Sequence, residues 1–482
     1  MKITPIIGLE VHVELQTKSK MFCSCDASHF HATPNTHTCP VCLGLPGALP
    51  VPNRTACEYC IKLGLALGCS INNETFFERK NYFYPDLAKS YQLTQLQKPF
   101  AINGKITIDD HEIRINRAHM EEDTGKSVHQ TIDFEDSTLI DYNRSGVPLV
   151  EIVSEPDITS PEMAKNYLLK IQQIVRYVGV SDADIEKGSM RCEPTVNLKI
   201  EDNGETFYTP MAEIKNVASL TGVQSAIQFE IDRQTKAFEE TRETKSPTNK
   251  TTRGWDAVKN QTFLQREKEG SADYRYFPEP DIPPVVFTDE EINKIKGSLP
   301  ELPEQKFARY QADFGLNDYD AKLLSEDLNF SKCFEQAISL NPTKDMAKLV
   351  ANLFLGSLKT YLNETQEELD INKINPEFFK NIFDAVSKSE ISATVAKQVI
   401  VESYQTGIDP IETAKSKGLI QVSDTDEIEK IAKEVISQNA KAVEDYKKNP
   451  ASIGFLIGQL MKASKGSANP TIAKEILEKL LK

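Results

Sequence analysis

The sequence lacks any apolar run long enough to cross a bilayer, and its first residues lack the apolar segment of a signal peptide. We therefore expect a cytoplasmic protein that does not bind membranes. The chain has 482 residues, of which 39% are hydrophobic and 26% are charged. This length and composition are typical of a soluble globular protein with two or three domains.

Basic residues are too few to balance the acidic ones, since 56 lysines and arginines face 71 aspartates and glutamates, for a net charge of −15. This deficit argues against nucleic-acid binding driven by overall charge, which requires a surplus of positive side chains. Residues 441–482 reverse the balance, with eight lysines against four acidic residues. A local positive patch is therefore expected there.

The nine cysteines are an odd number and lie mostly in the first seventy residues, which does not fit a disulfide framework. Two close pairs, Cys23 with Cys25 and Cys39 with Cys42, supply four soft ligands within tetrahedral reach. Structural zinc requires such a set. The alternative is four reduced cysteines in a turn-rich loop. We do not expect the three histidines between the pairs to be ligands, because four cysteines already fill the coordination sphere.

Glu10, His12 and Glu14 alternate with apolar residues, and this period of two predicts a β-strand with one polar face. Side chains on that face are about 7 Å apart. Two carboxylates and an imidazole in a row could form one wall of a metal or acid–base site. The alternative is a solvated edge of an antiparallel sheet. A second acidic cluster at residues 119–123, and Glu151 after an apolar run, favour the site.

Aromatic and basic side chains are concentrated at residues 77–86, where rings and cations could stack a nucleotide base and hold a phosphate. The alternative is aromatic packing at a sheet edge. The Gly-Lys-Ser triplet at 125–127 does not complete a Walker A loop, because Met120 stands where a glycine is required. The candidate nucleotide-binding residues are Arg79, Lys80, Tyr82, Lys126, Glu213 and Lys215.

Capping residues and apolar periodicity predict three helices in the first half of the chain. They span residues 53–68, 160–178 and 219–238. Cys57 and Cys60 fall on the first of these, where we expect small packing residues rather than ligands. A hairpin is predicted over 102–115 with Asn103-Gly104 as its turn, and residues 239–252 are predicted to form an exposed loop.

The Pro-rich segment 273–284 predicts a domain boundary near residue 288. From Asp289 onward the pattern is helical with almost no strands. Lys462 and Lys465 flank a Gly-containing turn in the basic C-terminal part, which suits contact with a phosphate backbone. The alternative is a solvated helical face.

Five long motifs occur in order along the chain, at residues 7–15, 79–86, 119–126, 150–157 and 273–281. Together they resemble the B-subunit family of bacterial-type aspartyl/glutamyl-tRNA amidotransferases. The resemblance covers essentially the whole chain and departs from the family pattern at about 239–252. It implies an α+β fold with three parts. These are a β-rich antiparallel cradle domain that is catalytic (1–288), an all-α helical domain (289–405) and a small helical tail that binds tRNA (406–482).

The resemblance also implies a ligase reaction with glutamine as the amido donor. ATP phosphorylates the side-chain carboxylate of glutamate or aspartate misacylated onto tRNA(Gln) or tRNA(Asn), and ammonia then displaces the phosphate. The ammonia comes through a tunnel from a partner amidase (glutaminase) subunit, and a small third subunit completes a heterotrimer. Zinc on the four-cysteine loop occurs in part of the family. Which of the two tRNAs is the substrate stays open.

The acidic residues fit this chemistry, because phosphoryl transfer mainly needs positioning and charge neutralisation by Mg²⁺. The candidate catalytic residues are Glu10, His12, Glu121, Glu122 and Glu151, and the expected metal ligands are Glu10, His12, Glu122 and Glu151. Mg²⁺ prefers oxygen, so the histidine would act through water or admit Mn²⁺. No Ser or Cys arrangement of a glutaminase is evident, which agrees with ammonia being made elsewhere. Two other classes stay open: a zinc-bearing RNA-binding module and a metal-dependent phosphohydrolase.

Overall fold

The computed structural model of the chain describes residues 1–108, 110–132, 135–267, 274–420, 425–449, 452–464, 468 and 470–481. The chain divides into two compact units, Met1–Leu302 and Pro303–Lys482. None of the helices in these ranges combines the length and apolar composition that a bilayer crossing requires.

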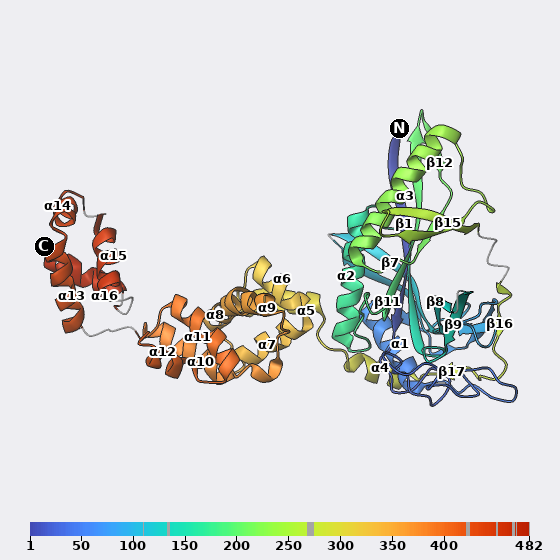
Figure 1. Cartoon of the computed structure of the whole chain (residues 1–482), viewed down its shortest axis with the longest axis horizontal. Helices are drawn as coiled ribbons and strands as arrows, with labels where there is room; N and C mark the ends of the chain where they lie inside the picture. The colour runs from blue at the N-terminus through green and yellow to red at the C-terminus, as the bar shows by residue number, and fades with distance from the viewer. Residues whose placement is uncertain are drawn as a thin grey trace. The chain divides into compact units, whose positions relative to one another are not determined.

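Within the described residues of the first unit, ten strands form one large sheet (Figure 1). Nine of them follow the order β15-β14-β13-β11-β1-β10-β7-β6-β2, and β12 pairs with β11. All pairings are antiparallel except β13 with β14. The strands are β1 (Lys2–Glu14), β2 (Ser70–Ile71), β6 (Ala101–Ile108), β7 (His111–Glu122), β10 (Pro148–Ser154), β11 (Met190–Asp202), β12 (Glu205–Tyr208), β13 (Ala212–Lys215), β14 (Thr251–Asp256) and β15 (Gln261–Glu267).

Three helices pack on one face of this sheet (Figure 1). They are α1 (Arg54–Ala66), α2 (Pro161–Val178) and α3 (Leu220–Thr241), and they confirm the three predicted helices. The side chains of Asn53, Ser160 and Ser219 accept hydrogen bonds from the first turns, as N-caps do. Leu9 and Val11 of β1 are buried beneath the helices, and Cys57 and Cys60 of α1 join the same core. The opposite face of β1 therefore remains for its polar residues.

The hairpin predicted over 102–115 exists, but its predicted turn is wrong. β6 continues through Asn103 and Gly104, and the chain reverses between Ile108 and His111. A Cβ atom on Gly104 would lie 2.4 Å from Cys69 Sγ and 2.7 Å from the Leu67 carbonyl oxygen. The glycine thus permits a close approach of β6 to the end of α1 rather than a turn.

Smaller elements complete the first unit. They are the sheet of β16 (Phe277–Pro278), β4 (Glu78–Asn81) and β5 (Tyr91–Thr94), the pair β17 (Val285–Val286) and β3 (Glu74–Thr75), the hairpin β8 (Lys126–Ile132) and β9 (Glu135–Asp141), and the helix α4 (Asp289–Gly297).

The second unit is helical, with one hydrophobic core around Phe334 and Phe354 and another around Leu456 and Leu477. With the first unit it confirms the predicted α+β class. The domain limits at 288 and 405 stay predictions. The helices are α5 (Pro303–Ala312), α6 (Asp318–Glu326), α7 (Leu328–Ile338), α8 (Lys344–Asn352), α9 (Lys359–Thr365), α10 (Pro376–Ser387), α11 (Ala393–Thr406), α12 (Pro410–Ser416), α13 (Thr425–Gln438), α14 (Ala440–Lys448), α15 (Ile453–Ala463) and α16 (Pro470–Leu481), with a π-helical segment at Leu353–Leu358 and a 3-10 turn at Ile371–Lys373.

Candidate active site

The polar face of β1 lies at the centre of a row of ionisable side chains. His12 lies opposite both Glu151 on β10 and Arg191 on β11. Glu151 in turn lies opposite His119 on β7. Directly opposite residues of antiparallel strands project to the same face of the sheet. The polar strand face predicted from the alternation at the N-terminus is therefore confirmed, and it lies inside the sheet rather than at its edge.

Three residues of this face form a compact group. His12 Nε2 is 3.5 Å from Glu151 Oε2 and 4.0 Å from Glu121 Oε2. The potential ligand atoms of these residues all lie within 4.8 Å of one another. Two carboxylates and one imidazole that converge in this way fit a divalent cation such as Mg²⁺ or Mn²⁺.

The carboxylate of Glu121 is held in place by β5, before any ligand binds. Thr94 Oγ1 donates to Glu121 Oε1 at 2.8 Å, and the Gln92 side-chain amide donates to Oε2 at 3.1 Å. Hydrogen bonds of this kind orient a metal-binding or catalytic carboxylate. The geometry of the group is therefore built into the fold.

In the group of His12, Glu121 and Glu151, attraction between opposite charges outweighs the cost of burying them. Burial opposes a charge on His12, but the hydrogen bond with Glu151 and the surrounding carboxylates raise its pKa to about 9. Burial also opposes ionisation of Glu151. The positive charges of His119, His12 and Lys80 nevertheless bring its pKa well below the ordinary value. The pKa of Lys80 is raised, against burial, by Glu121, Tyr276 and Glu151. Without a bound metal, the site thus holds ionised carboxylates around the positive charges of His12 and Lys80. A divalent cation bound to His12 would take the place of the proton on that ring nitrogen.

Glu10 and Glu122, the other two candidate catalytic carboxylates, lie outside this group. Glu122 follows Glu121 on β7, so its side chain points away from that of Glu121. It accepts a hydrogen bond from Leu93 N at 3.0 Å and forms an ion pair with Lys89. Glu10 lies two residues before His12 on β1, opposite Glu193. Their predicted roles as metal ligands stay predictions, because the structure brings Glu121 rather than Glu122 to His12.

His119 is a site residue that the sequence interpretation did not select. Its Nε2 is 3.5 Å from Glu121 Oε1 and 3.5 Å from Glu151 Oε2. The ring is buried, and its Nδ1 has no hydrogen-bond partner among the described residues. The alternation of His119 with Glu121 along β7 is the signal that could have identified it, because residues two apart on a strand share a face.

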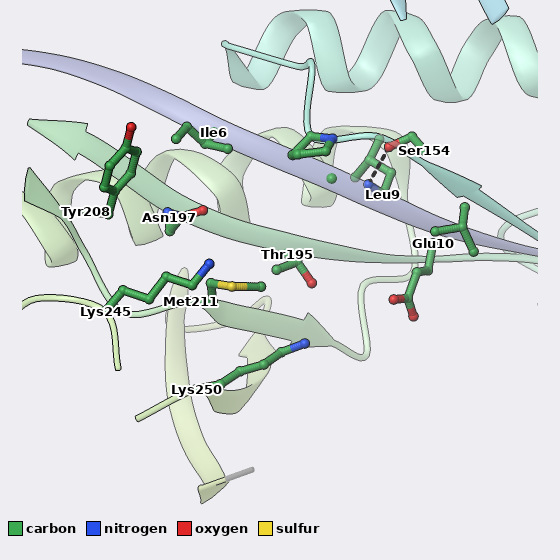
Figure 2. Close-up of a pocket in the computed structure, with 13 residues that line it drawn as sticks. Ile6, Leu9, Glu10, Ser154, Thr195, Asn197, Tyr208, Met211, Lys245 and Lys250 are labelled. Atoms are coloured by element: carbon green, nitrogen blue, oxygen red, sulfur yellow. Dashed lines mark hydrogen bonds between the residues drawn. The ribbon is translucent and has the colours of Figure 1, made fainter. Parts of the chain in front are cut away.

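A pocket of about 330 Å³ lies on the same face of β1, where Glu10 is one of its lining residues (Figure 2). Gly8 and Glu10 of β1 and Thr195 of β11 line its floor. Lys245 and Lys250 reach it from the segment after α3, within the predicted exposed loop (Figure 2). The sequence interpretation did not assign these lysines to any site, because a local pattern does not show where a loop folds back.

Two predicted nucleotide contacts, Glu213 and Lys215, lie next to this pocket. Glu213 is 3.6 Å from Lys250 Nζ and 3.2 Å from Lys215 Nζ. Lys215 also pairs with Glu193 on β11. Positive and negative side chains thus alternate from the pocket toward His12, in the order Lys250, Glu213, Lys215 and Glu193.

Like Glu213 and Lys215, the other predicted nucleotide contacts are not among the residues that line the pocket. Arg79 donates to both carboxylate oxygens of Glu279, at 2.6 and 2.9 Å, and its guanidinium stacks on Tyr91. Lys80 lies over the ring of Tyr274, which also packs edge-on against Tyr82. Lys126 is exposed at the start of β8. Aromatic and ionic packing thus occupies the Arg79 side chain, and the nucleotide-binding role of these residues stays a prediction.

The four predicted zinc ligands come together. Cys23, Cys25, Cys39 and Cys42 have sulfur atoms within 4.8 Å of one another, and the last two are 3.9 Å apart. A tetrahedral site with Zn–S bonds of about 2.3 Å requires sulfur separations of about 3.8 Å. Hydrogen bonding with Cys23 is the main cause that lowers the pKa of Cys42 to about 4. The donor set therefore fits zinc. His29, from the same loop, instead contacts Glu14 at 3.0 Å.

We predict about one equivalent of zinc in protein purified without chelator, measured by elemental analysis. Cys42→Ser should lose the metal, because three sulfurs and a hydroxyl form a weaker site. Cys57→Ala is the matched control and should retain it, since Cys57 is buried in the core under α1. Less than roughly a tenth of an equivalent in the unmodified chain would contradict the prediction.

Two family models match most of this chain. The family model described as the GatB/GatE catalytic domain matches residues 5–293, and that of the GatB domain matches residues 332–481. The first unit is thus a catalytic domain of the GatB/GatE class. The chain belongs to the B-subunit family of the aspartyl/glutamyl-tRNA(Asn/Gln) amidotransferases.

Relatives that carry this B-subunit name match along 99% or more of their length. That of Persephonella marina is 45% identical over 487 residues, and that of Thermosipho melanesiensis is 44% identical over 484 residues, each covering 100% of both chains. That of Thermotoga maritima is 42% identical over 489 residues, covering 100% of this chain and 99% of the relative.

Proposed function

We propose that this chain amidates glutamate or aspartate misacylated onto tRNA(Gln) or tRNA(Asn), after phosphorylating the side-chain carboxylate with ATP. The observation that carries the proposal is that the pocket and the group of ionisable side chains lie on one face of β1. Glu10, which lines the pocket, lies two residues before His12 on that face, and His12 converges with Glu121 and Glu151. A volume of about 330 Å³ suits a small-molecule site. We place the nucleoside of ATP in the pocket and its phosphates toward His12.

Transfer of a phosphoryl group to a carboxylate brings two anions together, so uncompensated repulsion would raise the barrier. Lys245 and Lys250 present positive charge to the pocket. His12, Glu121 and Glu151 would hold a divalent cation, which when bound neutralises charge and orients the phosphates. Because one donor is an imidazole, Mn²⁺ is expected to substitute well for Mg²⁺.

The same proposal includes the assembly in which the chain works. Its relatives are named as one subunit of a larger enzyme. We propose a cytoplasmic heterotrimer with an amidase subunit, which releases ammonia from glutamine, and a small third subunit. Glutamine hydrolysis would then need a nucleophile on another chain. The basic helical tail would bind the tRNA, because positive side chains contact the phosphate backbone.

The assay supplies the complex with free ammonia, ATP and misacylated tRNA, and measures ADP and amidated tRNA separately. Formation of both products, dependent on misacylated tRNA, supports the proposal. ADP production without any need for tRNA would instead indicate a phosphohydrolase. Binding of tRNA without either product would indicate an RNA-binding module.

Lys250→Met should raise the KM for ATP about tenfold or more, the scale of one lost contact to a charged group. The KM for tRNA should not change. Lys236→Met is the matched control, since this exposed lysine of α3 pairs only loosely with Glu240, at 4.0 Å. An unchanged KM for ATP in the Lys250 variant would mean that the nucleotide does not bind in this pocket.

A further inference from the structure

Lys20 has no exposed surface and lies beside the four-cysteine site. Its Nζ donates to the carbonyl oxygen of His37 at 2.7 Å and to that of Tyr142 at 3.3 Å. The same nitrogen is 3.8 Å from Cys42 Sγ. The aliphatic part packs closely enough at Gly146 that an added Cβ there would lie 3.6 Å from Lys20 Cδ. The two carbonyl groups and Cys42 thus fix the position of the ammonium.

A buried ammonium is costly unless a negative group compensates its charge. Over the described ranges, no carboxylate oxygen forms an ion pair with Lys20, and the two carbonyl groups that it contacts are neutral. Cys42 Sγ is the remaining contact of Nζ. The Glu122 carboxylate also lies near Gly146, but it forms its ion pair with Lys89. The sulfur is therefore the contacting group that can supply a counter-charge to Lys20.

The four-cysteine site carries an excess of negative charge when it binds zinc. Zinc binds cysteine as the thiolate, and four thiolates around Zn²⁺ leave a net charge of −2. Groups that contact a ligand atom from outside the coordination sphere typically change metal affinity 10- to 100-fold. We propose that the Lys20 ammonium is such an outer partner, which contacts Cys42 and strengthens zinc binding at the four cysteines.

Two variants separate the charge of Lys20 from its hydrogen bonds. Lys20→Gln retains a donor for the carbonyl oxygens but removes the charge, and Lys20→Met removes both. We expect both to weaken zinc affinity about 10- to 100-fold in the full chain, measured by competition with a chromogenic chelator. Lys62→Met is the matched control, because Lys62 also donates to a main-chain carbonyl, that of Val178 at 2.6 Å, in the same unit. It should keep the affinity of the unmodified chain.

Thermal unfolding with and without added zinc tests whether Lys20 acts through the metal site. If Lys20 only packs, each variant should lower both melting temperatures equally and leave the increment due to zinc unchanged. The proposal expects a smaller increment in both variants. It is overturned if the variants bind zinc as the unmodified chain does, if only Lys20→Met is affected, if the increment is unchanged, or if the unmodified chain binds no zinc.

Discussion

Replacing Glu121 or Glu151 with glutamine should slow ATP cleavage and amide formation by roughly a hundredfold or more, the scale of losing one electrostatic contact in a transition state. Glutamine keeps the shape of the side chain and removes its charge. The two carboxylates converge with His12 within 4.8 Å, so each loss would weaken the hold on a divalent cation. The measurement uses free ammonia and follows ADP and amidated tRNA separately. Glutamine hydrolysis by the partner should continue at its basal level at least.

Two further variants make this experiment decisive. Glu155→Gln is the control, because this half-buried residue follows β10 and its carboxylate accepts a hydrogen bond from Asn116 at 2.7 Å, outside the group of His12. Glu122→Gln distinguishes the two ligand sets. A comparable loss in Glu122→Gln would support the set predicted from the sequence, whereas near-normal activity would support Glu121. Normal ADP production in both Glu121→Gln and Glu151→Gln would exclude this group as the phosphoryl-transfer site.

Removal of the tail should raise the apparent KM for charged tRNA tenfold or more, because several phosphate contacts would be lost together. The predicted tail begins at residue 406, but Ala414 of α12 is buried in the larger helical core. Truncation after residue 420 keeps that helix and removes α13–α16, which have a core of their own. An unchanged KM would contradict tRNA binding by the tail.

A single-site version of this test uses Lys462, in the last turn of α15. Lys462→Ala should weaken tRNA binding and reduce the slope of log affinity against log salt by about 1. Lys433→Ala is the control, because this lysine of α13 pairs with Glu429 at 2.7 Å. Lys465, the other predicted tRNA contact, lies outside the described residues. Equal salt slopes for Lys462→Ala and the unmodified chain would argue against the contact.

Short sequence patterns predicted correctly those features of the fold that depend on residues close together in the chain. Period-two alternation identified the polar face of β1, and capping residues such as Asn53 identified helix starts, because both depend on residues a few positions apart. The same alternation separates Glu121 from Glu122, although the prediction did not use it. The spacing of the cysteine pairs was sufficient to predict that the four sulfurs converge, because zinc ligation has few geometries.

Contacts distant in sequence were not predictable in this way. Lys250 reaches a pocket whose floor includes Gly8 and Glu10, more than two hundred positions earlier in the chain. Arg79 is held by Glu279, and the burial of Lys20 depends partly on Tyr142. At Gly104 the local turn signal gave way to packing against Leu67. These contacts depend on how strands and loops from distant parts of the chain assemble. A short stretch of sequence does not carry that information.

The adjacent carboxylates of β7 have a consequence for how this strand can evolve. Glu121 contacts His12, and Glu122 pairs with Lys89. Gain or loss of one residue earlier in β7 would turn both side chains to the opposite face of the sheet and take each carboxylate away from its partner. The number of residues between the turn after Ile108 and Glu121 should therefore be invariant in functional homologues. Insertions should instead occur in the exposed hairpin β8–β9, where a change of length leaves both carboxylates in place.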